Sequence, residues 1–454
     1  MPYFRQHIIK FTFCIFFIIY SEVALFAQQQ EEPLVLTEEA AVLRAIDRNS
    51  NVYLARNEKA IKSAIRYSAW SALYPHISAS AGILYNPEKP KVSEMLRPGS
   101  QLGLTASLDF NWTFSASTIP TILRAKLDWE ESGVSYEDTK RKIERDIRKL
   151  FLDLLFQRES LLLVREQQKA AEERYVHTKI AYRNGTIDEF TYLSVGLEAR
   201  NLQYNVKVSE EQYKQMLRTF KLLLGIEQPT PIILKGSLNL DQYDITLKKE
   251  LLNQVRTRPE IKKLFLSISK LRMDRKIKAL GFLPTLSLGY RFNPQFLGDP
   301  ETASWVDANN WNNKKGVFTL VFNQSIDVFF PNSRNLTELK TINLSLASLQ
   351  DQLDQAIAAA QVAIDTLKSN IYTGTDSIRA LEYMVRITKR KQELAEEAFN
   401  SGGKTFDEFR KTELEYRDAR QQLMRQKLQV LKYAIDLAYE LGVPLESIVR
   451  LKEK

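Results

Sequence analysis

Side chains that could carry out catalysis are sparse and scattered along this 454-residue chain. The potential metal ligands other than carboxylates lie far apart: His7, His76, His177 and Cys14. The sequence contains no glycine-rich phosphate loop, serine elbow or metal-binding His-Glu pair. Adjacent acids such as Glu172-Glu173 fall within charge patterns typical of solvated helix faces. The sequence therefore predicts no enzyme, no metal site and no cofactor.

One acidic cluster could act without catalysis. Glu393, Glu396 and Glu397 lie within about three helical turns before Gly402, near the end of a long helical segment. Carboxylates repeated around a narrow axis would attract cations and repel anions, which is the chemistry of a pore constriction. The alternative is ordinary charge on a helix surface. The choice depends on the elements that position the cluster.

The cluster lies in one of two long segments without proline, Pro120 to Pro229 and Pro331 to Pro444. In both, apolar residues recur three, four or seven apart among charged residues, the pattern of long helices with a coiled-coil seam. Asn184-Gly185 interrupts the first segment and Gly402 the second. We predict two helical hairpins, at about 118–225 and 332–442, whose first helix is on the order of 100 Å long.

Strand-like alternation precedes each hairpin, at about 76–114 and 284–330. The alternating apolar positions include Leu102, Leu104, Leu108, Phe110, Trp112, Leu286, Leu288, Tyr290, Phe318, Leu320 and Phe322. Thr105 and Asp109 lie on the polar side. Strands of about 10 residues with one apolar and one polar face are typical of membrane barrels with lipid outside and water inside. A sandwich strand with one face on a core is the alternative.

The order of elements occurs twice. Helices at about 36–72 and 258–279 precede the two strand pairs, and the matching positions are Pro75 and Pro284, Gly185 and Gly402, and Gly225 and Gly442. The two later pairs are each 217 residues apart. We predict repeats over 28–225 and 248–442, joined by a mixed linker at 226–247 and followed by a tail at 443–454.

Residues 1–27 have the pattern of a secretory signal. Basic residues precede an apolar run at 11–20 that is too short to span a bilayer, and small residues follow. Cys14 lies within the run without a lipidation motif, so we expect no lipid on the mature N-terminus. The net charge of +9 falls to +8 without this segment. That charge is spread along helices, which favours solvated surfaces over nucleic-acid binding.

Four strands with a lipid-facing side cannot close alone. An open edge within a bilayer leaves backbone groups unpaired, at a cost of several kcal/mol each. Three copies would supply a 12-stranded barrel and a tube of twelve long helices. The sequence thus predicts a mainly α-helical protein with a β-barrel part that is completed in a homotrimer.

These features resemble the TolC family of outer-membrane efflux and secretion channels. The resemblance rests on the duplicated order, the turn at 181–186 followed by Tyr192-Leu193, the Leu-Leu-Gly ending at Gly225 and the turn at 398–402. It implies a periplasmic helical tunnel below the barrel, with an acidic constriction near Glu393, Glu396 and Glu397. It also implies that the turns contact a periplasmic adaptor: Asn184, Gly185, Thr186, Gly402, Gly403 and Lys404. Gly402-Gly403-Lys404 departs from the family's more usual single glycine.

We therefore expect a passive exit duct in the outer membrane of a Gram-negative-type bacterium. The resemblance implies that a periplasmic adaptor (a membrane fusion protein) and an inner-membrane pump would drive tripartite efflux or type I secretion of small molecules or protein. A periplasmic coiled-coil tether is the alternative, and it would not need an apolar stripe such as 102–112. A small-molecule-binding helical protein would need a closed apolar pocket, which no segment suggests. The sequence identifies neither the cargo nor the pump class.

Overall fold

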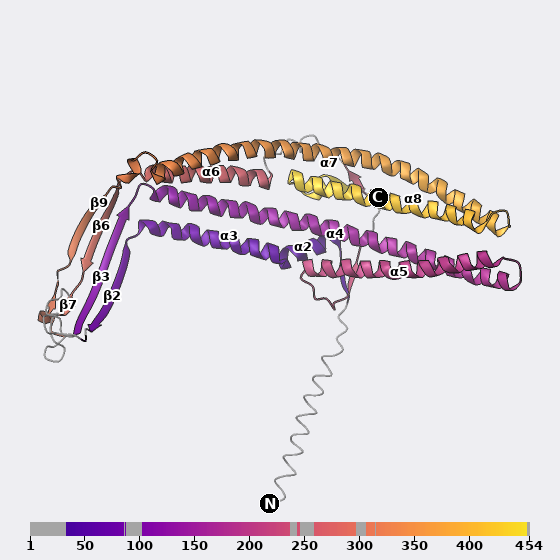
Figure 1. Ribbon diagram of the computed structural model, residues 1–454, viewed down its shortest axis with the longest axis horizontal. Helices are drawn as coiled ribbons and strands as arrows, with labels where there is room; N and C mark the ends of the chain where they lie inside the picture. The colour runs from indigo at the N-terminus through magenta and orange to yellow at the C-terminus, as the bar shows by residue number, and fades with distance from the viewer. Residues whose placement is uncertain are drawn as a thin grey trace, which may run out of the picture.

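The computed structural model describes residues 33–85, 87, 102–236, 243–245, 258–296, 306–313 and 315–451. The predicted signal segment 1–27 and parts of the predicted linker and tail lie outside these residues. The chain is an elongated rod of long helices, with a sheet at one end and two hairpin turns at the other (Figure 1). The predicted mainly α-helical fold with a β part is confirmed.

Two long helices run the length of the rod. Helix α4 (Thr118–Arg183) turns back into α5 (Glu189–Leu223), and α7 (Arg334–Asn400) turns back into α8 (Phe406–Leu441). The returning helices are about half as long, with 35 and 36 residues against 66 and 67. Helices α3 (Ser50–Ser68) and α6 (Pro259–Leu280) cover the sheet-side halves of the long helices (Figure 1).

The single helix predicted over 36–72 is wrong. The structure contains β1 (Leu34–Leu36), α2 (Glu38–Arg48), α3 and the 3-10 helix η1 (Ala69–Leu73). The break lies at Asn49, whose side-chain oxygen accepts a hydrogen bond from the Asn51 backbone N–H at 2.9 Å. The Asn49 amide donates to the Leu223 carbonyl at 3.0 Å. A contact from the end of α5 therefore stabilises an interruption that local periodicity does not reveal.

The four main strands form one antiparallel sheet in the order β2 (His76–Tyr85), β3 (Leu102–Phe114), β6 (Thr285–Phe292) and β9 (Val317–Asn323). These are the predicted strand regions. Two short strands that the sequence pattern did not reveal, β7 (Gln295–Phe296) and β8 (Trp311–Asn312), extend the sheet beside β3. The described sheet therefore has six strands, rather than the four predicted.

The middle of the rod joins the two repeats. Strand β1 pairs in parallel with β4 (Ile232–Leu234), and β5 (Tyr243–Ile245) pairs antiparallel with β10 (Val449–Leu451). We call this middle region, with β1, β4 and the apolar side chains packed against them, the equator.

Three short 3-10 helices complete the described elements: η5 (Ala308–Asn310), η6 (Asp327–Phe329) and η7 (Leu445–Ser447).

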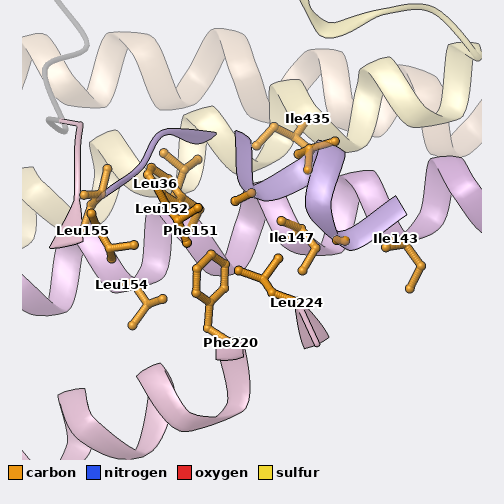
Figure 2. Close-up of a cluster of buried hydrophobic side chains, with 14 of the residues drawn as sticks. Leu36, Ile143, Ile147, Phe151, Leu152, Leu154, Leu155, Phe220, Leu224 and Ile435 are labelled. Carbon is orange, nitrogen blue, oxygen red and sulfur yellow. The ribbon is translucent and has the colours of Figure 1, made fainter. Parts of the chain in front are cut away.

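The main apolar core lies at the equator (Figure 2). Phe151 of α4 and Phe220 of α5 are almost fully buried, and their ring centroids lie 6.2 Å apart. Leu36 of β1 and Ile435 of α8 pack in the same cluster. Segments from both repeats thus bury apolar area together, which stabilises their association. In the described part of the chain, no helix is both long enough and apolar enough to cross a membrane.

Candidate functional site: the hairpin tips and the two-faced sheet

The turn between α4 and α5 closes by a Schellman motif. The Thr186 backbone N–H donates to the Ala181 carbonyl and the Gly185 N–H donates to the Tyr182 carbonyl, both at 3.0 Å. Gly185 has φ +69°, the left-handed conformation that this motif requires at its glycine. The Thr186 hydroxyl also donates to the Ala181 carbonyl at 2.8 Å.

The turn between α7 and α8 has the same backbone geometry. Gly403 donates to the Ala398 carbonyl at 2.7 Å, and Gly402, with φ +78°, donates to the Phe399 carbonyl at 3.0 Å. The departure at Gly402-Gly403-Lys404 therefore leaves the backbone motif intact. It removes only the hydroxyl hydrogen bond that Thr186 makes in the first turn. A Cβ added at Gly185 or Gly402 would meet open space.

Side-chain caps begin the returning helices. Asp188 accepts hydrogen bonds from the Thr191 hydroxyl at 2.6 Å and from the Thr191 backbone N–H at 3.1 Å, which lower the pKa of the Asp188 carboxyl. Thr405 and Glu408 form a capping box, and the hydrogen bond from the Thr405 backbone lowers the pKa of Glu408. Both turns are thus fixed on either side by local hydrogen bonds.

A groove of about 840 Å³ lies between the two tips. Phe399, Phe406 and Phe409 provide its apolar lining, with charged side chains such as Glu396 and Lys404 beside them. Of the predicted adaptor contacts, Thr186, Gly402 and Lys404 line the groove, whereas Asn184, Gly185 and Gly403 do not. The structure brings residues of both turns together around one surface.

The predicted acidic cluster occupies positions i, i+3 and i+4 of α7 and therefore lies on one face of the helix. Glu396 lines the groove, whereas Glu393 and Glu397 are not among its lining residues. Glu393 pairs with Arg390 at 3.2 Å and lies 3.9 Å from the Lys389 ammonium. Positive charge thus lies one turn from the carboxylates. The constriction at these residues stays a prediction.

A second charged cluster near the tips was not predicted. It joins Arg174 of α4, Glu198 of α5, and Arg410 and Glu413 of α8. The Arg174 guanidinium donates to Glu413 and lies over the Phe409 ring, 4.7 Å from the centroid. Burial, and then the charge of Glu413, raises the pKa of Glu198. Nothing in the local sequence distinguishes Glu198 from exposed glutamates. Its burial results from the tertiary packing of the helices around it.

The strand register collects the predicted lipid-facing residues on one face of the sheet. Leu108 pairs with Phe292, Phe110 with Tyr290 and Trp112 with Leu288. The pairing continues to β9, where Leu286, Leu288 and Tyr290 lie opposite Phe322, Leu320 and Phe318, and Leu102 lies opposite Tyr85 of β2. Side chains alternate along a strand, so all these positions share a face.

The opposite face is predominantly polar. Asp109 pairs with Arg291 at 2.5 Å and accepts a hydrogen bond from Ser107 at 3.2 Å. Thr105 donates to the Gly82 carbonyl at 3.4 Å. The sheet therefore separates an apolar surface from a mainly hydrogen-bonding one. The described residues contain no group of three or more His, Cys, Asp or Glu side chains that could hold a metal.

Several solved outer-membrane proteins share this fold. The CmeC outer-membrane channel of Campylobacter jejuni superposes with a TM-score of 0.77 at 16% identity, over 89% of this chain and 85% of that chain. The outer-membrane protein VceC of Vibrio cholerae gives 0.73 at 14% identity, over 90% and 97%. The open-state MtrE channel of Neisseria gonorrhoeae gives 0.70 at 15% identity, over 90% and 89%.

At these identities the comparison establishes the fold, and the resemblance to the TolC family is confirmed at that level. No family model and no curated protein sequence matches the chain. The likeness thus lies in the arrangement of helices and strands and is not detectable in the sequence by these comparisons.

Proposed function

We propose that this chain is one of three subunits of an outer-membrane exit duct, open to the periplasm through its helical end. The supporting observation is the combination of a two-faced sheet at one end of the rod with paired hairpin turns at the other (Figure 1). The sheet supplies an apolar face for lipid and a mainly polar face for a water-filled lumen. The long helices would extend the lumen into the periplasm.

The outer faces of the chain support assembly with further copies. Strands β2 and β9 are exposed along their lengths and lie at sheet edges, where unpaired backbone groups cannot remain within a bilayer. Large side chains on α5 and α7 are also exposed, including Tyr204 at 68% and Tyr372 at 63%. In a closed ring of three copies, pairing β9 of each chain with β2 of the next would cover both edges of every sheet and bring these helices together.

Gel mobility with and without boiling, together with membrane fractionation, tests this assembly. We expect a heat-sensitive trimer in the outer-membrane fraction. A stable soluble monomer would contradict the duct and favour the periplasmic tether. A variant with Leu320→Asp on the proposed lipid face should lose membrane assembly, whereas Thr319→Asp on the opposite face should retain more of it.

We further propose that the turns at Gly185 and Gly402 contact a periplasmic adaptor, which would couple the duct to an inner-membrane pump. Their position at the end of the rod remote from the sheet, and the groove between them, support this contact. Cysteines at Thr186 and Lys404 should crosslink to the adaptor in cells. A cysteine at Lys207, exposed on α5, is the control. Equal crosslinking from all three positions would argue against docking at the tips.

The glutamates near the second turn are proposed to line the narrow end of the duct. Replacing Glu393, Glu396 and Glu397 together with glutamine should reduce cation preference and block by divalent cations in planar bilayers. Glu172→Gln, on the exposed surface of α4, is the control. Unchanged selectivity in the triple variant would place the constriction elsewhere while leaving the trimeric duct intact.

A further inference from the structure

Glu198 is a carboxylate in an unusual setting. Its side chain is only 10% exposed, although it lies on a helix near the end of the rod. Among the described residues, its Oε2 atom is buried and has no hydrogen-bond partner. An ionised carboxylate in such a position loses hydration without a compensating hydrogen bond at that oxygen. The function proposed above assigns no role to this group.

The charges that face Glu198 come from both hairpins. Arg174 of α4 lies 3.8 Å away, and Arg410 of α8 lies 3.7 Å away, beyond hydrogen-bonding distance in each case. Glu413 and Arg417 of α8 complete the charged surroundings. Since α8 belongs to the other hairpin, separation of the hairpins would remove these neighbours and expose Glu198 to water.

The apolar cluster beside Glu198 also contains residues of both hairpins. Val195, one turn before Glu198 on α5, packs in a small cluster with Ala395 of α7 and with Phe406 and Phe409 of α8. Separation of the tips would therefore hydrate the apolar cluster and the carboxylate together. The ionisation of Glu198 and the contact between the hairpins are thus coupled through one surface.

We propose that Glu198 makes the contact between the two hairpin tips proton-dependent, so that acid holds the tips together and a rise in pH loosens them. The closed arrangement accepts a proton on Glu198 more readily than the open arrangement does. The proton is exchanged with solvent, and no other reaction is involved.

The direction follows from linkage between proton binding and conformation. In the closed arrangement, burial and then Glu413 raise the pKa of Glu198, and Arg410, Arg174 and Arg417 only partly offset this rise. When Glu198 is exposed to water, the pKa of its carboxyl returns towards the ordinary value of 4.5. Proton uptake therefore gives the closed tips its full stabilisation at pH values below 4.5. The stabilisation is lost as pH rises through the raised pKa.

The test is a distance measurement by pulsed electron paramagnetic resonance on the full-length protein. Nitroxide labels at Thr186 and Lys404 would report the separation of the two turns, since both residues are exposed and lie on different hairpins. We expect a narrow distance distribution at pH 4 and a broader, longer one at pH 8. Identical distributions at the two pH values would overturn the proposal.

Two variants separate titration of Glu198 from a merely structural role. Glu198→Gln keeps the shape but cannot ionise, so it should give the narrow distribution at both pH values, while Glu172→Gln should behave as the unmodified chain. Arg410→Gln removes a cation that favours ionised Glu198, so the midpoint of the transition should move to higher pH. An unchanged midpoint, or pH dependence that persists in Glu198→Gln, would overturn the proposal.

The proton-dependent contact is independent of the proposed duct, but its effect on transport rests on that function. If the tips close the duct, acid should lower the conductance of the purified trimer and Glu198→Gln should remove this dependence. A pH-dependent distance without a pH-dependent conductance would retain the proton-dependent contact and contradict the placement of the duct entrance at the tips.

Discussion

The equator and the tips both join the two hairpins, but they do so with different strength. At the equator, buried side chains from α2, α4, α5, α8 and two strands form one large cluster. The nearby Lys149 ammonium bonds both oxygens of Asp436, at 2.9 and 2.8 Å. At the tips, the buried apolar cluster is small, Arg410 lies 3.7 Å from Glu198, and Arg174 lies 3.3 Å from Glu413. The comparison predicts a stronger joint in the middle of the rod and a weaker one at its end.

The largest effect should follow from Phe151→Ala at the equator. Removal of a fully buried phenyl ring leaves a cavity and should destabilise the fold by about 3–5 kcal/mol. We expect a large loss of melting temperature, measured by circular dichroism. Phe190→Ala, which removes a ring that is 71% exposed, is the matched control. If both variants melted alike, the equatorial cluster would not be the main joint.

Phe409→Ala should act locally at the tips. Phe409 is as buried as Phe151, but its cluster is small and its neighbour Arg174 is half-buried. We expect faster amide hydrogen exchange around both turns, with exchange at the equator unchanged. The melting temperature should fall much less than in Phe151→Ala. Loss of protection along the whole rod would instead show that the tips and the equator unfold as one unit.

Glycine substitutions can be compared directly between the tips and the equator, because the same turn motif occurs at Gly185 and at Gly225. Gly185→Ala should cost about 1–2 kcal/mol from the left-handed backbone alone, since a Cβ there meets open space. Gly225→Ala adds close contact, because a Cβ would lie 3.0 Å from the Arg48 Cβ. The melting temperature should therefore fall further in Gly225→Ala than in Gly185→Ala. The reverse order would contradict the packing of the equator.

The smallest effect is expected from Thr405→Ala. The change removes the hydroxyl that accepts the Glu408 backbone N–H and should destabilise the start of α8 by about 1 kcal/mol. Hydrogen exchange at residues 406–409 should increase without a change in melting temperature. Thr405→Ser retains the hydroxyl and should restore protection; if it did not, the cap would not be responsible for the change.

Sequence periodicity predicted the elements that depend on local pattern. The alternation in β3 and the glycines at both turns are sufficient to place the strand and the hairpins, because side-chain spacing and left-handed backbone are local properties. The strands β7 and β8 were missed because two-residue strands carry no period. The break at Asn49 was missed because it depends on the distant Leu223 carbonyl.

The candidate site was less accessible from sequence. Helical spacing groups Glu393, Glu396 and Glu397 on one face, but it does not reveal that only Glu396 lines the groove between the tips. Glu198 is different, because its burial results from contact between hairpins far apart in the sequence. Its environment therefore requires the assembled fold. Contacts between the two hairpins are therefore the part of the site that sequence periodicity does not predict.

The unbroken course of α4 has a mechanical consequence. Phe151 lies near the midpoint of the helix, so that each half extends roughly 50 Å from the equator at ~1.5 Å per residue. A rigid rod pivoting there would move its sheet end as far as its tip, in the opposite direction. Because the sheet hydrogen-bonds strands of both repeats together, that end resists such a displacement. Movement of the tip would therefore require bending of the helix on the tip side of the equator, and the equator would act as a clamp and not as a hinge.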